Sequence, residues 1–283
     1  LTAFAGGYPA GAKSAEALFS EGVISRKEGE RLCNIAFCAG PGFAIGMIGA
    51  GLYNEKSLGL LILTAQVISC IIIGIAYNVS GFRDNHSVSR SAIRPVQQIG
   101  KADAFVCAVS DSAESMLHMC GFIVLFRVLS SLLDAAGIND LLGRMTGWIG
   151  LGAVGMDILP CVSEVTAGSI LSVKYGVPFT SFLVGFGGLS VHFQNFAICR
   201  EIRPRKLVYL TTRIAQGTLC ALITSLSLRL PFFSEFSLPT SRTMISGIPT
   251  AFSQGTAGFG CALLVMCLMS VICLPRRSGA EGE

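Results

Sequence analysis

One segment of the chain, residues 58–77, is predominantly apolar and contains no charged residue. As a helix, these 20 residues would cross a hydrocarbon core that is about 30 Å thick. The rest of the chain has the same character, since it is 52% hydrophobic and only 13% charged, with a mean hydropathy of +0.65. A soluble domain carries about 25% charged residues. The sequence therefore predicts an integral membrane protein.

The charged and sulfur-containing residues argue against several other classes of protein. The net charge of +4 is too small to suggest a nucleic-acid partner, and the basic residues lie in short loops. The 11 cysteines have no metal-ligand spacing and mostly lie in apolar runs, so we expect buried side chains and neither a metal nor a cofactor. No P-loop occurs, and Ser190 and His192 are too close on one helix to form a catalytic pair. We expect no enzyme.

Hydropathy and loop charge together predict how the chain crosses the bilayer. The predicted crossings are 35–53, 58–78, 118–135, 178–199, 207–227 and 258–274, with 142–173 dipping into the membrane and returning. All four clusters of Lys and Arg then fall on one side, which we expect to be cytoplasmic. Ser25 and Glu28 form a capping box that begins a charged helix before the first crossing. An amphipathic helix at 102–116 and a separate apolar helix at 119–133 are expected further along.

Two pairs of glycine-rich tracts interrupt the apolar segments, and the second pair repeats the arrangement of the first. The first pair is 6–13 and 39–43, and the second is 164–169 and 185–192. An unpaired backbone group in lipid costs several kcal/mol, so a span is broken only where protein or a wet cavity can satisfy it. Matching broken segments in two halves indicate the binding site of a transporter.

These pairs divide the chain into two gate-like halves, residues 1–103 and residues 104–283, the second carrying the C-terminal spans. The chain begins at Leu1 inside a glycine-rich motif, so we expect the first half to lack N-terminal spans. We predict an all-α, polytopic, transporter-like fold. Its two pseudo-repeated broken or re-entrant helix elements are expected to meet near the membrane midplane.

Glu164 is the foremost candidate for a functional group, because ionisable residues at membrane depth are costly and usually functional. It lies in a stretch where the helix is expected to unwind, with Thr166 and Gly168 beside it. A carboxylate there can bind a cation or a proton, or accept hydrogen bonds from a substrate. The alternative is a hairpin tip that is exposed to water.

A second candidate group follows the break at 185–188. Free backbone N–H groups and the positive end of the following half-helix suit a carboxylate or a phosphate. A histidine in this position can add a charge that depends on proton binding near neutral pH, although a satisfied core histidine is the alternative. The predicted substrate-binding residues of this tract are Gly187, Ser190, His192 and Gln194.

The first half offers a basic candidate and a second break. Lys13 closely follows Gly11 and is either a counter-charge for an anion or a lysine that snorkels to the interface. Gly40 and Pro41 would break the first crossing and expose carbonyl groups. These tracts together predict a site within the lipid bilayer for a small anionic substrate, with a proton or a cation as the coupling ion.

The same tracts also resemble a known family. The motifs at 7–13, 28–32, 39–43, 164–168 and 187–194 are similar, in this order, to those of the YlbJ-type sporulation integral membrane proteins. The resemblance covers nearly the whole chain. It implies kinship with the nucleoside-recognition gate domains of spore maturation proteins and nucleoside transporters.

The resemblance also implies a function. Family members act in the mother cell of endospore-forming bacteria and are linked to movement of dipicolinic acid, a small aromatic dicarboxylate, across the outer forespore membrane. Cys38 departs from the family pattern, which is expected to have a polar residue there. Two alternatives stay open. An extra carboxylate beside the site would favour a nucleoside-type carrier. A non-transporting scaffold for the spore cortex or envelope would pack its broken segments without a polar cavity.

Overall fold

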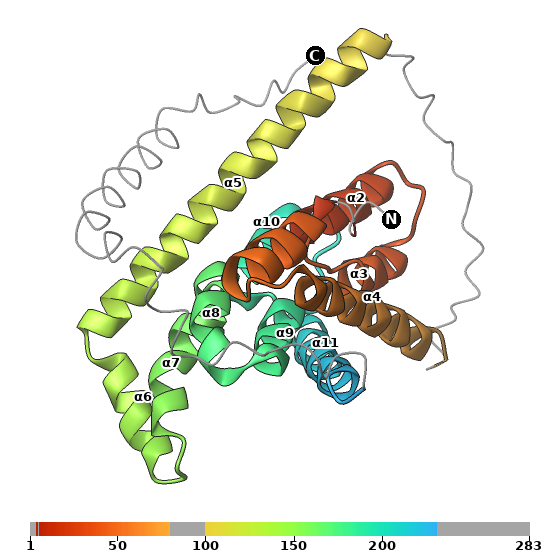
Figure 1. Cartoon of the computed structure of the whole chain (residues 1–283). Coiled ribbons are helices and arrows are strands. Elements are labelled where there is room, and N and C mark those ends of the chain that lie inside the picture. Colours follow the sequence, from red (N-terminus) through yellow and green to blue (C-terminus); the bar gives the residue numbers. More distant parts are fainter. Residues whose placement is uncertain (1–3, 5, 80–99, 231–283) are drawn as a thin grey trace.

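The computed structural model describes residue 4, residues 6–79 and residues 100–230. Within these ranges every regular element is a helix, and Figure 1 shows a bundle of helices flanked by one much longer helix, α5. The predicted crossing at 258–274 lies outside the described residues. The all-helical part of the predicted fold is therefore confirmed for the described part of the chain.

The first part of the chain forms four elements, and the predicted first crossing at 35–53 is not one continuous helix, because it falls mainly on the non-helical residues 36–40 and on a short π-helix. They are α2 (Tyr8–Ser20), α3 (Arg26–Ile35), the π-helix η1 (Gly42–Leu52) and α4 (Lys56–Val79). Helix α3 begins with the predicted capping box, in which the backbone N–H of Ser25 donates to Glu28 Oε2 at 2.8 Å and the backbone N–H of Glu28 donates to Ser25 Oγ at 3.3 Å. Residues 36–40 are not helical and separate α3 from η1.

The second part of the chain forms a long helix followed by shorter ones. They are α5 (Lys101–Ala135), α6 (Ile138–Gly147), α7 (Gly152–Ser163), α8 (Val165–Ser172), the 3₁₀ turn η2 (Val173–Tyr175), α9 (Val177–Phe186), α10 (Gly188–Ile198) and α11 (Lys206–Ser227). The expectation of separate helices at 102–116 and 119–133 is wrong. Helix α5 runs through both because the residues that join them, Met116 to Met119, include neither Gly nor Pro.

Three of the described helices are long and apolar enough to cross a membrane. They are Lys56–Tyr77, Phe105–Ala135 and Lys206–Ser227. The second is longer than the predicted crossing at 118–135, and most of its surface faces away from the bundle: Leu117 is 72% exposed and Leu132 is 62% exposed. Cys120 on the same helix is also exposed, contrary to the expectation that it is buried. Such an apolar outer surface is suited to lipid contact.

Elements from both predicted halves share one core. Helix α11 packs along α9 and α4, and α10 packs on α2, as Figure 1 shows for α9 beside α11. The main apolar cluster includes Tyr8 of α2, Ile62 of α4, Val184 of α9 and Tyr209 of α11, with Phe37 from the irregular segment between α3 and η1. The irregular segment between α3 and η1 therefore contributes to the core of the bundle.

Candidate functional site

The four glycine-rich tracts come together in the middle of the bundle. The first two touch at Gly7 and Gly40, where a Cβ atom on Gly7 would lie 3.2 Å from the backbone N of Gly40. The last two touch at Gly188, where a Cβ atom would lie 3.0 Å from the backbone N of Val165. In each contact the backbone of one tract lies directly against the backbone of another.

The two pairs of tracts are joined by a contact between Phe37 and Gly187. Gly187 separates α9 from α10 and has a φ of +90°, a conformation that residues with a side chain rarely adopt. A Cβ atom at this position would lie 2.3 Å from Cζ of Phe37. The break between α9 and α10 is thus fitted to the ring that projects from the break between α3 and η1. We call this meeting point of the broken segments the junction.

Aromatic rings fill the junction. The ring centroid of Phe37 lies 4.7 Å from that of Tyr8, 5.9 Å from that of His192 and 6.4 Å from that of Tyr209. The imidazole of His192 stands almost perpendicular to the rings of Phe186 and Tyr209, at 4.7 Å and 5.4 Å. The predicted residue His192 is therefore a buried member of an aromatic cluster on the inner face of α10.

A fully buried arginine lies within this cluster. The guanidinium carbon of Arg213, on α11, lies 4.2 Å from the ring centroid of Phe37 and 5.3 Å from that of Tyr209, which are cation–π distances. Arg213 donates hydrogen bonds to the backbone carbonyl of Asn34 and to Oε1 of Gln216. No carboxylate among the described residues pairs with it. A full positive charge at membrane depth is therefore held by neutral partners alone, which is energetically costly.

Several buried polar atoms of the elements that meet at the junction have no hydrogen-bond partner among the described residues. They are Oδ1 of Asn34, Nε2 of Gln66, Oγ of Ser190, Nε2 of His192, Nε2 of Gln194, Oδ1 of Asn195 and Nε of Arg213. Most buried polar side-chain atoms in proteins are hydrogen-bonded to protein or to ordered water. Such a concentration of unsatisfied donors and acceptors suits a polar ligand or trapped water.

The polar face of α10 is turned toward α11. Nδ2 of Asn195 donates to the hydroxyl of Tyr209 at 2.8 Å, and Nδ1 of His192 lies 3.4 Å from the same hydroxyl. Ser190 and Gln194, which the sequence analysis placed in the site, are also buried on this helix. The structure thus gathers the predicted residues of the last tract on one buried helix beside Arg213.

Glu164 has a clear structural role. It is 1% exposed and caps the N-terminus of α8, where its Oε1 accepts from the backbone N–H of Thr166 at 2.8 Å and its Oε2 from that of Ala167 at 2.7 Å. Such caps satisfy the free amides at the start of a helix. The cap accounts for a buried carboxylate without a bound ligand, and its role in coupling or substrate contact stays a prediction. Gly168 lets α8 approach α7, since a Cβ there would lie 2.4 Å from the carbonyl O of Cys161.

The predicted residues of the first half divide between the surface and the bundle. Gly11 is buried in α2, but Lys13 is exposed and its Nζ donates to Ser115 Oγ at 3.0 Å, on α5. Gly40 lies in the break, and Pro41 is exposed at the start of η1. Lys13 therefore does not supply the cation of the junction.

The cation that does so, Arg213, was not among the candidates from the sequence. Its signal was present, because a single arginine stands between Thr212 and Ile214 in the apolar helix that follows a basic loop. An arginine in the first two turns of a span normally snorkels to the interface, and the amino-acid sequence does not show that this one turns into the bundle.

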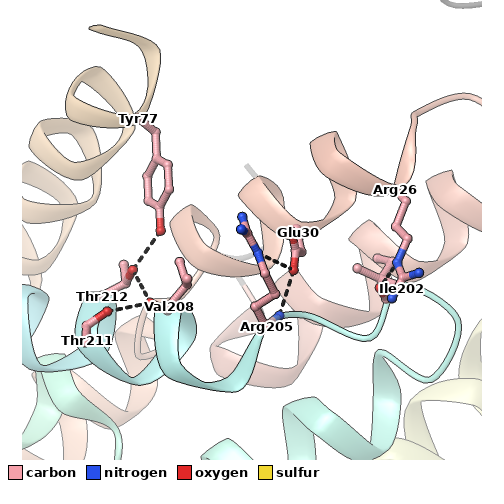
Figure 2. A network of polar contacts seen from close by, with 8 residues as sticks. All are labelled: Arg26, Glu30, Tyr77, Ile202, Arg205, Val208, Thr211 and Thr212. Atoms are coloured by element: carbon pink, nitrogen blue, oxygen red, sulfur yellow. Dashed lines mark hydrogen bonds and ion pairs between the residues drawn. The ribbon is translucent and has the colours of Figure 1, made fainter. Parts of the chain in front are cut away.

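A pocket of about 420 Å³ opens where α3, the end of α4 and the start of α11 meet. We call it the basic pocket. It is lined by Arg26, Lys27, Glu30, Arg31, Asn34, Tyr77 and Arg205. Figure 2 shows part of its wall: Arg26 Nε donates to the carbonyl of Ile202 at 2.8 Å, and Glu30 Oε1 accepts from the backbone N–H of Arg205 at 2.7 Å. Two of the four basic clusters of the sequence thus lie side by side.

A comparison with characterised proteins shows to what this molecule is related. Over 282 residues the chain is 27% identical to the sporulation integral membrane protein YlbJ of Bacillus subtilis (strain 168), and the match covers 89% of this chain and 69% of that protein. The chain is a homologue of YlbJ. No family model and no solved structure matches it.

The homology to YlbJ confirms the resemblance that the sequence motifs indicated. Together with the three candidate spans, it makes the chain an integral membrane protein related to a bacterial sporulation protein. The descriptive name of YlbJ refers to sporulation and to an integral membrane protein. It refers neither to a substrate nor to a transport activity.

Proposed function

We propose that this YlbJ homologue is a carrier of a small organic anion, with dipicolinic acid as the favoured substrate, across the outer forespore membrane. The observation that supports this most directly is Arg213, a fully buried cation at the junction with only neutral partners among the described residues. A cation retained at membrane depth without a carboxylate is stabilised whenever an anion binds beside it.

The chemistry of the junction fits an aromatic carboxylate better than a simple inorganic ion. A guanidinium can hold a carboxylate through parallel hydrogen bonds, and the Nε of Arg213 has no partner among the described residues. The rings of Phe37 and Tyr209 already pack against Arg213, and aromatic surroundings of this kind are suited to an aromatic substrate. His192 and Gln194 supply further polar atoms that lack partners within the described structure.

Movement of the substrate is proposed to use the two pairs of broken tracts as the moving parts. Carriers of this type rock one repeat against the other around a central site that is built from interrupted helices. The contact between Phe37 and Gly187, which joins the two pairs, would change in each cycle. We assign proton coupling to His192, because it is a buried imidazole in contact with both Phe37 and Tyr209. No covalent chemistry on the substrate is proposed.

Two alternatives are weaker on the same observations. An additional carboxylate beside the site would favour a nucleoside-type carrier, but the carboxylate oxygens of Glu164, whose backbone lies against Gly188, already accept bonds from amides of α8. A non-transporting scaffold would pack its broken segments without unsatisfied polar groups, whereas seven such atoms lie on the elements of the junction within the described residues.

The test is uptake of labelled dipicolinate by liposomes that contain the purified protein. We expect uptake well above that of empty liposomes, and no uptake of labelled uridine. Arg213→Gln should abolish uptake, and His192→Ala should abolish its dependence on a pH gradient. Arg200→Gln, which removes an exposed charge, is the control and should leave uptake unchanged. Uridine uptake without dipicolinate uptake would overturn the proposal in favour of a nucleoside carrier, and uptake of neither would favour the scaffold.

A further inference from the structure

The basic pocket is separate from the junction, although the two are neighbours. Asn34 lines the pocket, and its carbonyl accepts a hydrogen bond from the buried Arg213. Helix α3 ends one residue later, at Ile35, and Phe37 then covers the guanidinium of Arg213. The last turn of α3 and the residues after it therefore form a thin wall between the pocket and the junction.

The charge of the pocket favours an anion. Four of its lining side chains are cationic, namely those of Arg26, Lys27, Arg31 and Arg205, and Glu30 is its one carboxylate. A concave surface that is lined by one sign of charge concentrates ions of the opposite sign and accelerates their capture. Its volume of about 420 Å³ is in the range of sites for small organic ligands.

The cations of the pocket are held in place by the fold. Arg26 is fixed by its bond to the carbonyl of Ile202, and Arg205 by the bonds of its backbone N–H and its Nε to Glu30. On the opposite wall, the hydroxyl of Tyr77 lies 2.8 Å from that of Thr212, the residue before Arg213, as Figure 2 shows. A site whose charges are already positioned binds an anion with less loss of side-chain entropy.

We propose that the basic pocket is a second oxyanion site, which captures a carboxylate or a phosphate from the basic face of the membrane and, where the occupant is the free dicarboxylate, delivers it to Arg213. The delivery step rests on the proposed function, whereas the capture step does not. The occupant is either the free organic dicarboxylate or the phosphate of an anionic lipid, since both present an oxyanion to the same cations.

The binding test uses Arg213→Gln, which removes the cation of the junction and leaves the pocket. In detergent, added dipicolinate should still raise the melting temperature of this variant, because a ligand of the native state stabilises it. Adding Lys27→Gln to Arg213→Gln should reduce this rise, with the dissociation constant for dipicolinate increasing about 3- to 10-fold. Adding Lys206→Gln instead, an exposed lysine next to Arg205 that does not line the pocket, is the matched control and should have no effect.

Glu30→Gln in the Arg213→Gln background gives a change of the opposite sign. Removing the negative charge of Glu30 should tighten dipicolinate binding, and the glutamine keeps an oxygen that can still accept from Arg205. A role of these residues in folding alone would not produce weaker binding in one variant and tighter binding in the other. Equal dissociation constants in Arg213→Gln with and without Lys27→Gln would overturn the proposal that the basic pocket binds the anion.

The uptake measurement tests the delivery step and distinguishes the two possible sources of the oxyanion. In liposomes of phosphatidylcholine, Lys27→Gln should raise the KM for dipicolinate and leave the maximal rate unchanged. An unchanged KM would overturn the delivery step from the basic pocket and would leave Arg213 as the site of the proposed carrier. Replacing part of the lipid with phosphatidylglycerol should not alter the wild-type KM if the free dicarboxylate is the occupant. A KM that rises with phosphatidylglycerol only when Lys27 is present would identify the lipid phosphate as the occupant and would support the oxyanion site.

Discussion

The guanidinium of Arg213 lies over the ring of Phe37, 4.2 Å from guanidinium carbon to ring centroid, and the two residues come from opposite ends of the described chain. Phe37 stands in the break between α3 and η1, and its ring also fills the space that a side chain at Gly187 would need. One aromatic ring therefore connects a buried cation to both interrupted segments. A ligand bound to Arg213 would therefore act on the ring that packs against the breaks.

Arg213→Lys tests whether the planar guanidinium is needed or only its charge. Lysine keeps a positive charge but presents a compact ammonium that can neither stack on Phe37 in the same way nor bind a carboxylate through two parallel bonds. We expect dipicolinate uptake to fall about tenfold and to stay above that of Arg213→Gln, measured as initial rates in liposomes. Uptake equal to that of the wild type would show that a point charge is sufficient.

Gly187→Ala should destabilise the protein strongly. The substitution places a Cβ atom at 2.3 Å from Cζ of Phe37 and imposes a side chain on a backbone with φ of +90°. Strain of this kind costs about 1–3 kcal/mol, and overpacking of a core adds about 1–3 kcal/mol. We expect the free energy of unfolding in detergent to fall by roughly 2–6 kcal/mol.

Gly121→Ala is the matched control for this prediction. Gly121 lies within α5, and no other atom is within 4 Å of the position that its Cβ would occupy. Alanine in a helix is favoured over glycine by about 0.5–1 kcal/mol, so this variant should be slightly more stable than the wild type. Equal effects of the two substitutions would contradict the view that the break at Gly187 is fitted to Phe37.

Much of the fold followed from local signals in the sequence. The uncharged, predominantly apolar run at 58–77 predicted α4, and the pair Ser25 and Glu28 predicted the start of α3. Both signals depend only on residues close together in the chain. The tract at 185–192 contains the break at Gly187, whereas the tract at 39–43 predicted a break that the structure places slightly earlier, at 36–40. The π-helix η1 was not predicted, and the close packing of its Gly49 against Gly59 of α4 is a contact between two elements that local signals do not give.

The candidate site was less accessible to sequence analysis. The position of His192 after a break was a local signal, whereas the burial of Arg213 depends on partners such as Asn34, 179 residues away in the chain. The same limit applies to Lys13, whose contact with Ser115 turns it away from the junction. Charged residues near the end of a span can face lipid headgroups, water or the core, and only tertiary packing decides among these.

Glu164→Gln separates the role of this residue as a helix cap from a role in coupling. A glutamine keeps one oxygen that can accept an amide proton from α8, but it loses the charge and the second acceptor. We therefore expect the melting temperature to fall by an amount that corresponds to about 1 kcal/mol, with dipicolinate uptake retained. Loss of uptake in a variant whose melting temperature is unchanged would instead support the predicted coupling role.

The capping box of α3 should make a small contribution to stability that depends on pH. The backbone N–H and the hydroxyl of Ser25 donate to Glu28, which lies before the predicted crossing, and these bonds lower the pKa of that carboxyl from its ordinary value of 4.5. Because the pKa is lower in the folded state, the contribution is complete above the unfolded value and is lost as the pH falls through the folded value.

Melting temperatures at about pH 6 and about pH 4 check this expectation. The wild type should lose more stability between the two values than Glu28→Gln, whose side chain can still accept the bond from Ser25 but does not titrate. Ser25→Ala should cost about 1 kcal/mol at the higher pH, as is usual for the loss of an N-cap. The same loss between the two pH values in the wild type and in Glu28→Gln would show that the capping box does not contribute to it.

Cross-linking Cys33 to Cys199 tests whether the wall between the basic pocket and the junction has to move. The two buried sulfur atoms, on α3 and at the end of α10, lie 3.1 Å apart. With copper phenanthroline as the added oxidant, the two thiols lose two protons and two electrons and form a disulfide that ties α3 to α10. If the last turn of α3 moves aside to let the anion reach Arg213, uptake should fall at least about tenfold and recover on reduction with dithiothreitol. Cys33→Ser under the same oxidant should keep its uptake, and a cross-linked wild type that transports at the normal rate would show that this turn stays in place throughout the cycle.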